Sequence, residues 1–199
     1  NRNAGPSKKH LTSIMSTAER KDITPVREEV ESVVVRFAGD SGDGMQLTGG
    51  QFTQATALAG NDLATFPDFP AEIRAPAGTT FGVSSFQINF GARAIMTSGD
   101  DLDTLVVMNP AALKVEVENL KPGGLLVADT GSFTKRNLRK AGFEDNPLED
   151  DSLEGYRRII IDITKCTINA VQEFGLSNKE AVRSKNMWTL GLLMWLYGR

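Results

Sequence analysis

An apolar run at residues 33–38 leads directly into a loop with three glycines. The run is rich in β-branched residues, which is typical of a strand buried on both faces in a parallel sheet. The loop reads AGDSGDGMQ (residues 38–46), and apolar residues then recur at helical spacing up to Gly60. The pattern predicts a strand, a tight glycine turn and a helix, in that order.

Strand-like and helix-like segments keep alternating over the rest of the chain. Further strands are predicted at residues 61–66, 79–91, 104–108, 125–129 and 157–162. Helices are predicted after the N-cap and proline pair Asn109-Pro110, from a Thr164 cap to Phe174, and from a capping box that opens at Ser177. This alternation indicates an α/β fold: a single-domain, Rossmann-like, three-layer sandwich around a largely parallel sheet.

Three segments depart from a plain alternation. In residues 79–91 the apolar residues change phase, which predicts a bulge or bend near Ser84 and Ser85. Residues 131–156 are polar and irregular, and we expect their acidic cluster at residues 144–151 to be a solvated loop instead of a cation site. The last helix is apolar on two sides, which predicts burial on two sides, either in the core or against another domain or subunit.

Composition excludes several classes of function. The chain of 199 residues fits a polar tail at residues 1–30 and one domain at residues 31–199. A net charge of −3 with mixed signs argues against nucleic acid as a partner. The single cysteine, Cys166, and the single histidine, His10, exclude disulfide frameworks, zinc or iron–sulfur sites built from this chain alone, and nucleophiles paired with histidine. No apolar run is long enough to span a membrane, so we expect a cytoplasmic protein.

The glycine loop is the strongest candidate for a binding site. Glycine lets a ligand approach the main chain, and the amides at a helix N-terminus favour negative charge, so an anion is the expected ligand. Asp40 and Asp43 oppose this, because they would repel a phosphate unless they cap the helix, bind a hydroxyl or hold a cation. A turn that serves only the close packing of strand and helix stays open as the alternative.

Three well-known motifs do not fit this loop. The dinucleotide fingerprint G-x-G-x-x-G has its glycines in the other order, and Asp62 stands at the start of the predicted second strand instead of its end. A phosphate-binding P-loop ends in Gly-Lys-Ser/Thr, where this chain has Met45-Gln46. The GDG at residues 42–44 resembles the start of a thiamine diphosphate signature, but no Asn-Asn follows at a suitable distance.

Several separated segments together resemble a known family. They read RFAGDSGDGMQLTGGQF, TFPDFPAEIRAPAGTTFGVSSFQINFG, DTLVVMNPAAL, LKPGGLLVADTG and NMWTLGLLMWLYGR, and they cover about residues 32–199 in order. These segments are similar to the 2-oxoacid:ferredoxin oxidoreductases. Within that family they resemble the N-terminal gamma domain of the alpha subunit of the 2-oxoglutarate enzymes.

The resemblance implies an enzyme that decarboxylates 2-oxoglutarate on thiamine diphosphate, passes electrons through an iron–sulfur cluster to ferredoxin, and releases succinyl-CoA. Thiamine diphosphate, its magnesium ion and the cluster are then expected elsewhere in the complex. The implied partners are the rest of the alpha subunit, the beta subunit and ferredoxin. We expect no catalytic residue in this chain, because proton transfer falls to the cofactor and to other domains.

The resemblance also implies that this domain helps to form the coenzyme A site and the active-site entrance. We expect the backbone of the loop to contact coenzyme A, and Arg74, in a proline-rich loop, to pair with a phosphate or carboxylate. A structural salt bridge is the alternative for Arg74. The predicted binding residues are Gly39, Asp40, Ser41, Gly42, Asp43, Gly44, Met45 and Arg74.

Two functions of other classes stay open. The glycine loop alone would allow a free-standing nucleotide-binding module. The two-sided last helix would allow an assembly domain that binds no ligand and joins subunits through Trp188 and Trp195.

Overall fold

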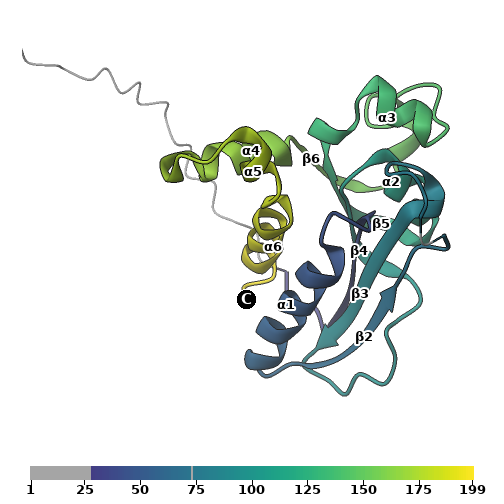
Figure 1. Ribbon diagram of the computed structural model, residues 1–199. Helices are drawn as coiled ribbons and strands as arrows, with labels where there is room; N and C mark the ends of the chain where they lie inside the picture. Colours follow the sequence, from purple (N-terminus) through teal and green to yellow (C-terminus); the bar gives the residue numbers. More distant parts are fainter. Residues whose placement is uncertain (1–27, 73) are drawn as a thin grey trace, which may run out of the picture.

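The computed structural model describes residues 28–72 and 74–199, so most of the predicted tail, including His10, lies outside the described residues. In that part the chain forms a six-stranded sheet with the order β2-β3-β1-β4-β5-β6 (Figure 1). The strands are β1 (Ser32–Asp40), β2 (Asp62–Asp68), β3 (Val83–Gly91), β4 (Leu102–Val107), β5 (Leu120–Asp129) and β6 (Arg157–Ile161). The helices are α1 (Met45–Leu58), α2 (Pro110–Glu116), α3 (Lys135–Lys140), α4 (Ile163–Ala170), α5 (Asn178–Val182) and α6 (Lys185–Leu196).

The sheet is largely parallel. Pairing is parallel between β1 and β4, between β4 and β5, and between β5 and β6, whereas β3 is antiparallel to both of its neighbours, β1 and β2. The carboxyl ends of β1, β4, β5 and β6 therefore lie at one edge, where ligands bind in open α/β sheets.

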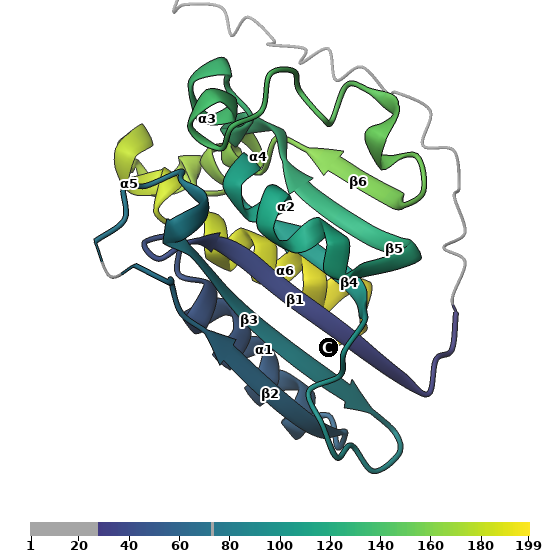
Figure 2. The same ribbon diagram turned by 90° about the vertical axis from the view of Figure 1, so that its right-hand side faces the viewer.

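Helices cover both faces of the sheet (Figure 2). On the face of α2, a core that includes Leu105, Leu113 and Leu126 is buried. On the face of α1 and α6, a second core includes Phe52 and Leu193. Two cores separated by one sheet make a three-layer α/β sandwich, so the predicted fold class is confirmed.

The bulge predicted near Ser84 and Ser85 is wrong. Strand β3 pairs residue by residue with β1 through both serines, and its unbroken pairing with β2 reaches Ser85. Phe81 belongs to a short 3-10 turn before the strand and is exposed, while eight of the nine β3 residues are buried. Because both faces of β3 are covered, its apolar residues need not alternate, and their phase carried no information about a bulge.

Polar segments account for two further differences. Residues 131–156, predicted to be irregular, contain α3, whose first turn is capped by Thr134. The neighbouring acidic side chains Glu144, Asp145 and Glu149 are exposed, as expected for a solvated loop. Strand β5 begins at Leu120 instead of residue 125, because Leu120 already pairs with Leu102 of β4. A register shift before the next pair accommodates the Pro-Gly-Gly segment, in which Gly123 has a φ of 74°.

The C-terminal helices also differ in detail from the prediction. Asp162, not Thr164, caps α4 by accepting a hydrogen bond from Lys165 N. The capping box at Ser177 is confirmed, but the helix that it opens, α5, ends at Val182, and α6 is a separate helix.

Helix α6 is buried along most of its surface but leaves an exposed stripe at Met187, Gly191 and Trp195. Leu190 and Leu193 lie in the core, and Trp188 and Leu192 are partly buried against it, whereas Trp195 is 72% exposed. A central core helix is therefore the wrong interpretation for this chain, and contact of the second face with another domain or subunit stays a prediction. No helix among the described residues has the length and apolar character needed to cross a membrane.

Two neighbouring glycines of α1 allow the packing of this helix on β3 to be tested. A Cβ at Gly49 would overlap the ring of Phe86, whereas a Cβ at Gly50 would meet open space. We expect Gly49→Ala to lower the free energy of unfolding by about 1–3 kcal/mol through overpacking. Gly50→Ala should raise it by about 0.5–1 kcal/mol, because alanine is the better helix former. Urea denaturation measures both, and equal effects of the two substitutions would contradict this packing.

Candidate functional site

The glycine loop forms a short turn at the carboxyl edge of the sheet. Strand β1 continues to Asp40 and α1 starts at Met45, with Asp43 N donating to Asp40 O at 2.8 Å in between. Gly44 occupies the N-cap position with a φ of 74°, a left-handed conformation that favours glycine. Among the described residues, no side chain caps the first amides of α1. The turn therefore leaves a helix N-terminus open at this edge.

The three glycines of the loop have different roles. A Cβ at Gly39 would lie 2.9 Å from Asp43 Oδ2, and a Cβ at Gly44 would lie 2.5 Å from Asn186 Nδ2. A Cβ at Gly42 would have no heavy atom of the described residues within 4 Å, and this glycine is exposed. Close packing thus explains Gly39 and Gly44, while the fold itself makes no demand on Gly42.

The two loop aspartates bind backbone donors. Asp43 Oδ2 accepts a hydrogen bond from Asp40 N at 2.9 Å. Asp40 Oδ1 accepts one from Gly78 N at 3.1 Å, which ties the loop to the β2–β3 connection. Both carboxyl groups therefore stabilise the shape of the loop.

A polar cavity of about 220 Å³ adjoins the loop. Its walls come from the ends of three parallel strands, from the β2–β3 connection, and from α3 and α6. The lining residues are Asp40, Asp43, Ala77, Gly78, Met108, Asn109, Ser132, Asn137, Lys140 and Lys185.

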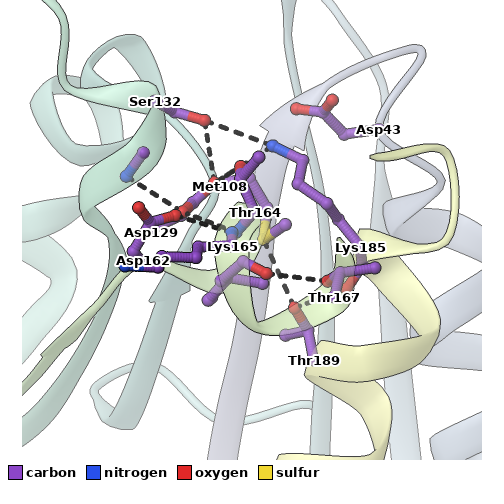
Figure 3. Close-up of polar contacts among 12 residues, drawn as sticks. Asp43, Met108, Asp129, Ser132, Asp162, Thr164, Lys165, Thr167, Lys185 and Thr189 are labelled. Atoms are coloured by element: carbon purple, nitrogen blue, oxygen red, sulfur yellow. Dashed lines mark hydrogen bonds and ion pairs between the residues drawn. The ribbon is translucent and has the colours of Figure 1, made fainter. Parts of the chain in front are cut away.

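Lys185, which lines this cavity, belongs to a buried ion pair (Figure 3). Lys185 Nζ, at the start of α6, lies 3.1 Å from Asp129 Oδ2 and 3.2 Å from Ser132 Oγ. The side chain of Asp129 is fully buried, and that of Lys185 is 14% exposed. Figure 3 shows the ammonium group of Lys185 directed at Ser132 and Asp129, with no interaction drawn between Lys185 and Asp43.

The carboxyl group of Asp43 is electrostatically unusual. Burial raises its pKa above the ordinary value of 3.8, and the neighbouring charges of Asp40 and Asp129 act in the same direction. The hydrogen bond from Asp40 N and the charge of Lys185 oppose this rise. The loop therefore holds a carboxyl group whose ionised form is costly and is supported by one lysine.

The predicted binding residues lie in different settings. Ser41 and Gly42 are exposed, whereas the Met45 side chain is 2% exposed and belongs to the core, so only its main chain is available to a ligand. Arg74 is exposed and does not line the cavity. None of the four ion pairs found among the described residues includes it.

Sequence reasoning missed most of the cavity wall. Asn109 was recognised only as a helix cap, although a polar residue directly after a parallel strand is a signal for this edge. Asp129, at the end of β5, carries the same signal. Lys140 and Lys185 carry none, because only the packing of α3 and α6 brings them to the cavity.

The raised pKa of Asp43 gives a pH-dependent prediction. Since the fold favours the protonated form, ionised Asp43 lowers stability at neutral pH, and Asp43→Asn should raise the thermal midpoint there. The gain should shrink as the pH falls through the raised pKa and vanish below 3.8, where Asp43 is protonated in both states. Calorimetry from pH 3 to 8 tests this, with exposed Asp145→Asn as the control. A gain that does not depend on pH would contradict the electrostatic origin.

Comparisons with known proteins agree with this architecture. Residues 34–198 match the family described as pyruvate ferredoxin/flavodoxin oxidoreductase. Over 175 residues, 88% of this chain, the sequence is 55% identical to the 2-oxoglutarate oxidoreductase subunit KorA of Mycobacterium tuberculosis. The match covers 27% of KorA, so the chain spans about a quarter of that relative.

Two solved structures are similar. The first is a 2-oxoglutarate:ferredoxin oxidoreductase from Magnetococcus marinus with 2-oxoglutarate, coenzyme A and succinyl-CoA bound, with a TM-score of 0.62, 27% identity, and 83% of this chain and 24% of that chain covered. The second is the gamma subunit of a keto/oxoacid ferredoxin oxidoreductase from Geobacter sulfurreducens, with a TM-score of 0.59 and 19% identity. It covers 85% of this chain and 78% of that chain, and shows the fold alone. The resemblance drawn from the sequence is thus confirmed, and the chain belongs to the pyruvate ferredoxin/flavodoxin oxidoreductase family.

Proposed function

We propose that this chain is a domain of a 2-oxoglutarate:ferredoxin oxidoreductase, which oxidatively decarboxylates 2-oxoglutarate to succinyl-CoA and reduces ferredoxin. The 55% identity to KorA supports the choice of oxo acid, as does the similarity to an enzyme whose structure holds 2-oxoglutarate and succinyl-CoA. Because the chain spans only about a quarter of KorA, the remaining machinery belongs to other parts of the complex. Those parts hold thiamine diphosphate with magnesium and the iron–sulfur cluster, and they include the rest of the alpha subunit, the beta subunit and the contact with ferredoxin.

Within that enzyme, the glycine loop contacts coenzyme A. The observation that carries this proposal is the uncapped N-terminus of α1 behind an exposed glycine, Gly42, at the carboxyl edge of the sheet. Amides at such a position suit the phosphates of coenzyme A, which carry negative charge. The hydrogen bonds that Asp40 and Asp43 accept from backbone groups explain why acidic residues stand in a loop that meets an anion.

Arg74 supplies a second contact with coenzyme A. It lies in the β2–β3 connection, and the hydrogen bond from Gly78 N to Asp40 Oδ1 holds this connection against the glycine loop. An exposed guanidinium group there suits a phosphate that reaches the loop from solvent.

The last helix gives the domain a role in assembly. Met187, Gly191 and Trp195 recur at four-residue spacing on α6 and are all exposed. A large exposed apolar residue such as Trp195 is typical of a contact surface, so this face of α6 meets another domain or subunit of the enzyme.

Gly42 provides a direct test of the coenzyme A contact. Because a Cβ at this position has no heavy atom of the described residues within 4 Å, we expect Gly42→Val to fold normally and to act only on a ligand. We expect the KM for coenzyme A to rise by about tenfold in the assembled enzyme, with the KM for 2-oxoglutarate unchanged. The matched control is Gly155→Val, at another exposed glycine with open space around it. An unchanged KM for coenzyme A in a stable complex would overturn the assignment.

Arg74 is tested by changing the ligand as well as the protein. Arg74→Gln should raise the KM for coenzyme A by roughly 2- to 5-fold, as expected for an exposed ion pair, and less so at high salt. If the 3'-phosphate is its partner, dephospho-coenzyme A should show no difference between the variant and the unaltered protein. Arg158→Gln, at an exposed position on β6, is the control. An equal KM for Arg74→Gln and the unaltered protein at low salt would contradict the contact.

A further inference from the structure

Gln46, in the first turn of α1, is a polar residue on the side of the helix that packs against the sheet. Gly49 follows it three positions later, and a Cβ at Gly49 would overlap the ring of Phe86 on β3. Residues three apart lie on the same side of a helix, so Gln46 faces the same part of the sheet. A polar side chain at such a contact needs hydrogen-bond partners.

Three acceptors at the end of the sheet meet the amide group of Gln46. Its Nε2 donates to Asp68 O at 3.1 Å, to Ser84 Oγ at 3.1 Å and to Ser85 O at 2.9 Å. Asp68 is the last residue of β2, and the two serines lie at the start of β3. Ser84 Oγ also donates to Asp68 O at 3.2 Å. One small network therefore joins the start of α1 to the ends of two strands.

The amide nitrogen of Gln46 is fully used by these contacts. It carries two hydrogens, and three protein acceptors already lie within hydrogen-bond distance. No donor is left over for a ligand, so any effect of this nitrogen on a ligand must pass through the position of the helix.

The main chain of Gln46 belongs to the part of α1 that is proposed to meet coenzyme A. The amides of Met45, Gln46 and Leu47 precede the first hydrogen bond inside the helix, which Thr48 N donates to Gly44 O at 2.9 Å. No side chain among the described residues caps this turn. Helix ends tend to fray, and amides that bind an anion must keep a fixed direction. The anchored side chain of Gln46 meets this need.

The same network holds the beginning of the β2–β3 connection, which carries Arg74. Asp68 O, one of the three acceptors, ends β2 directly before this connection. Near the other end of the connection, Gly78 N donates to Asp40 Oδ1 at 3.1 Å. Gln46 at one end and Asp40 at the other thus tie the connection to the glycine loop and its helix.

We propose that Gln46 is a positioning residue for coenzyme A. Its side chain fixes the first turn of α1 on the ends of β2 and β3, and this sets both the amides of the turn and the connection that carries Arg74. The proposal rests on the contact between the glycine loop and coenzyme A proposed above. It assigns no contact between the amide nitrogen of the Gln46 side chain and the coenzyme.

Kinetics of the assembled enzyme test this role. Gln46→Met keeps the length of the side chain and removes the donor. We expect the KM for coenzyme A to rise by about fivefold, with kcat and the KM for 2-oxoglutarate nearly unchanged, because only the positioning of the coenzyme is affected. Gln54→Met, at an exposed position of the same helix, is the control and should leave all three constants unchanged. An unchanged KM for coenzyme A in a folded Gln46→Met enzyme would overturn the proposal.

Ser84→Ala tests whether Gln46 acts through the network. This substitution removes one of the three acceptors, so it should raise the KM for coenzyme A by about threefold in the unaltered enzyme. In the Gln46→Met background it should change the KM by less than about 1.5-fold, because the donor is already gone. Equal effects in the two backgrounds would contradict the proposal, since Gln46 would then act independently of the strand ends.

Hydrogen–deuterium exchange of α1, measured in the assembled protein without coenzyme A, gives a readout that does not depend on catalysis. Gln46→Met should speed exchange of the first hydrogen-bonded amides, at residues 48–51, by roughly threefold or more. Exchange in the last turn, at residues 55–58, should stay the same. Unchanged exchange at residues 48–51 would exclude a role of Gln46 in holding the start of the helix.

Gly42→Val in the same kinetic assay separates this proposal from the proposed function. A raised KM for coenzyme A in Gly42→Val with an unchanged KM in Gln46→Met would overturn the role of Gln46 and leave the contact of the loop with coenzyme A in place. An unchanged KM in both variants, with faster exchange in Gln46→Met, would overturn that contact and with it the role of Gln46 in coenzyme A binding.

Discussion

The parallel pairing of β1, β4 and β5 is the constraint on which the rest of the site depends. Parallel strands end at the same edge, so the glycine loop after β1, Asn109 after β4 and Asp129 at the end of β5 meet there although they are far apart in the sequence. The two helical layers then hold these ends in place. The packing of Gly44 against Asn186 fixes α6 on the loop, and this contact brings Lys185 to the cavity.

The local elements of this site could be predicted from the sequence, but the long-range contacts that bring them together could not. The strand, glycine turn and helix at residues 32–58 could be predicted because each depends on neighbouring residues: a β-branched run, a left-handed N-cap and helical spacing. The ion pair of Asp129 and Lys185 joins positions 56 residues apart, and no local pattern predicts such a contact. The errors have the same physical origin. The early start of β5 depends on its pairing with β4. The unbroken register of β3, without the predicted bulge, goes with its burial on both faces.

At position 43, the stability of the fold and the proposed contact with coenzyme A make opposite demands on the side chain. A half-buried carboxyl group among other acids is a poor choice for stability, and an asparagine at position 43 would serve the same backbone donor without charge. A carboxylate there also accepts the hydrogen bond from Asp40 N that closes the turn next to the proposed coenzyme A contact. Local cost at a functional position, offset by the packing of the whole domain, is common in enzymes.

The edges of the sheet limit how this domain can join a larger complex. Strand β2 is one edge of the described sheet, and Pro67 near its end has no N–H to offer to a further strand. At the other edge, β6 is short and carries two exposed arginines, Arg157 and Arg158. Both features oppose the addition of strands from a neighbouring chain. Partners are therefore expected to contact this domain through side chains on its helical layers and loops. Such contacts depend on shape complementarity, and they add no strand to the sheet.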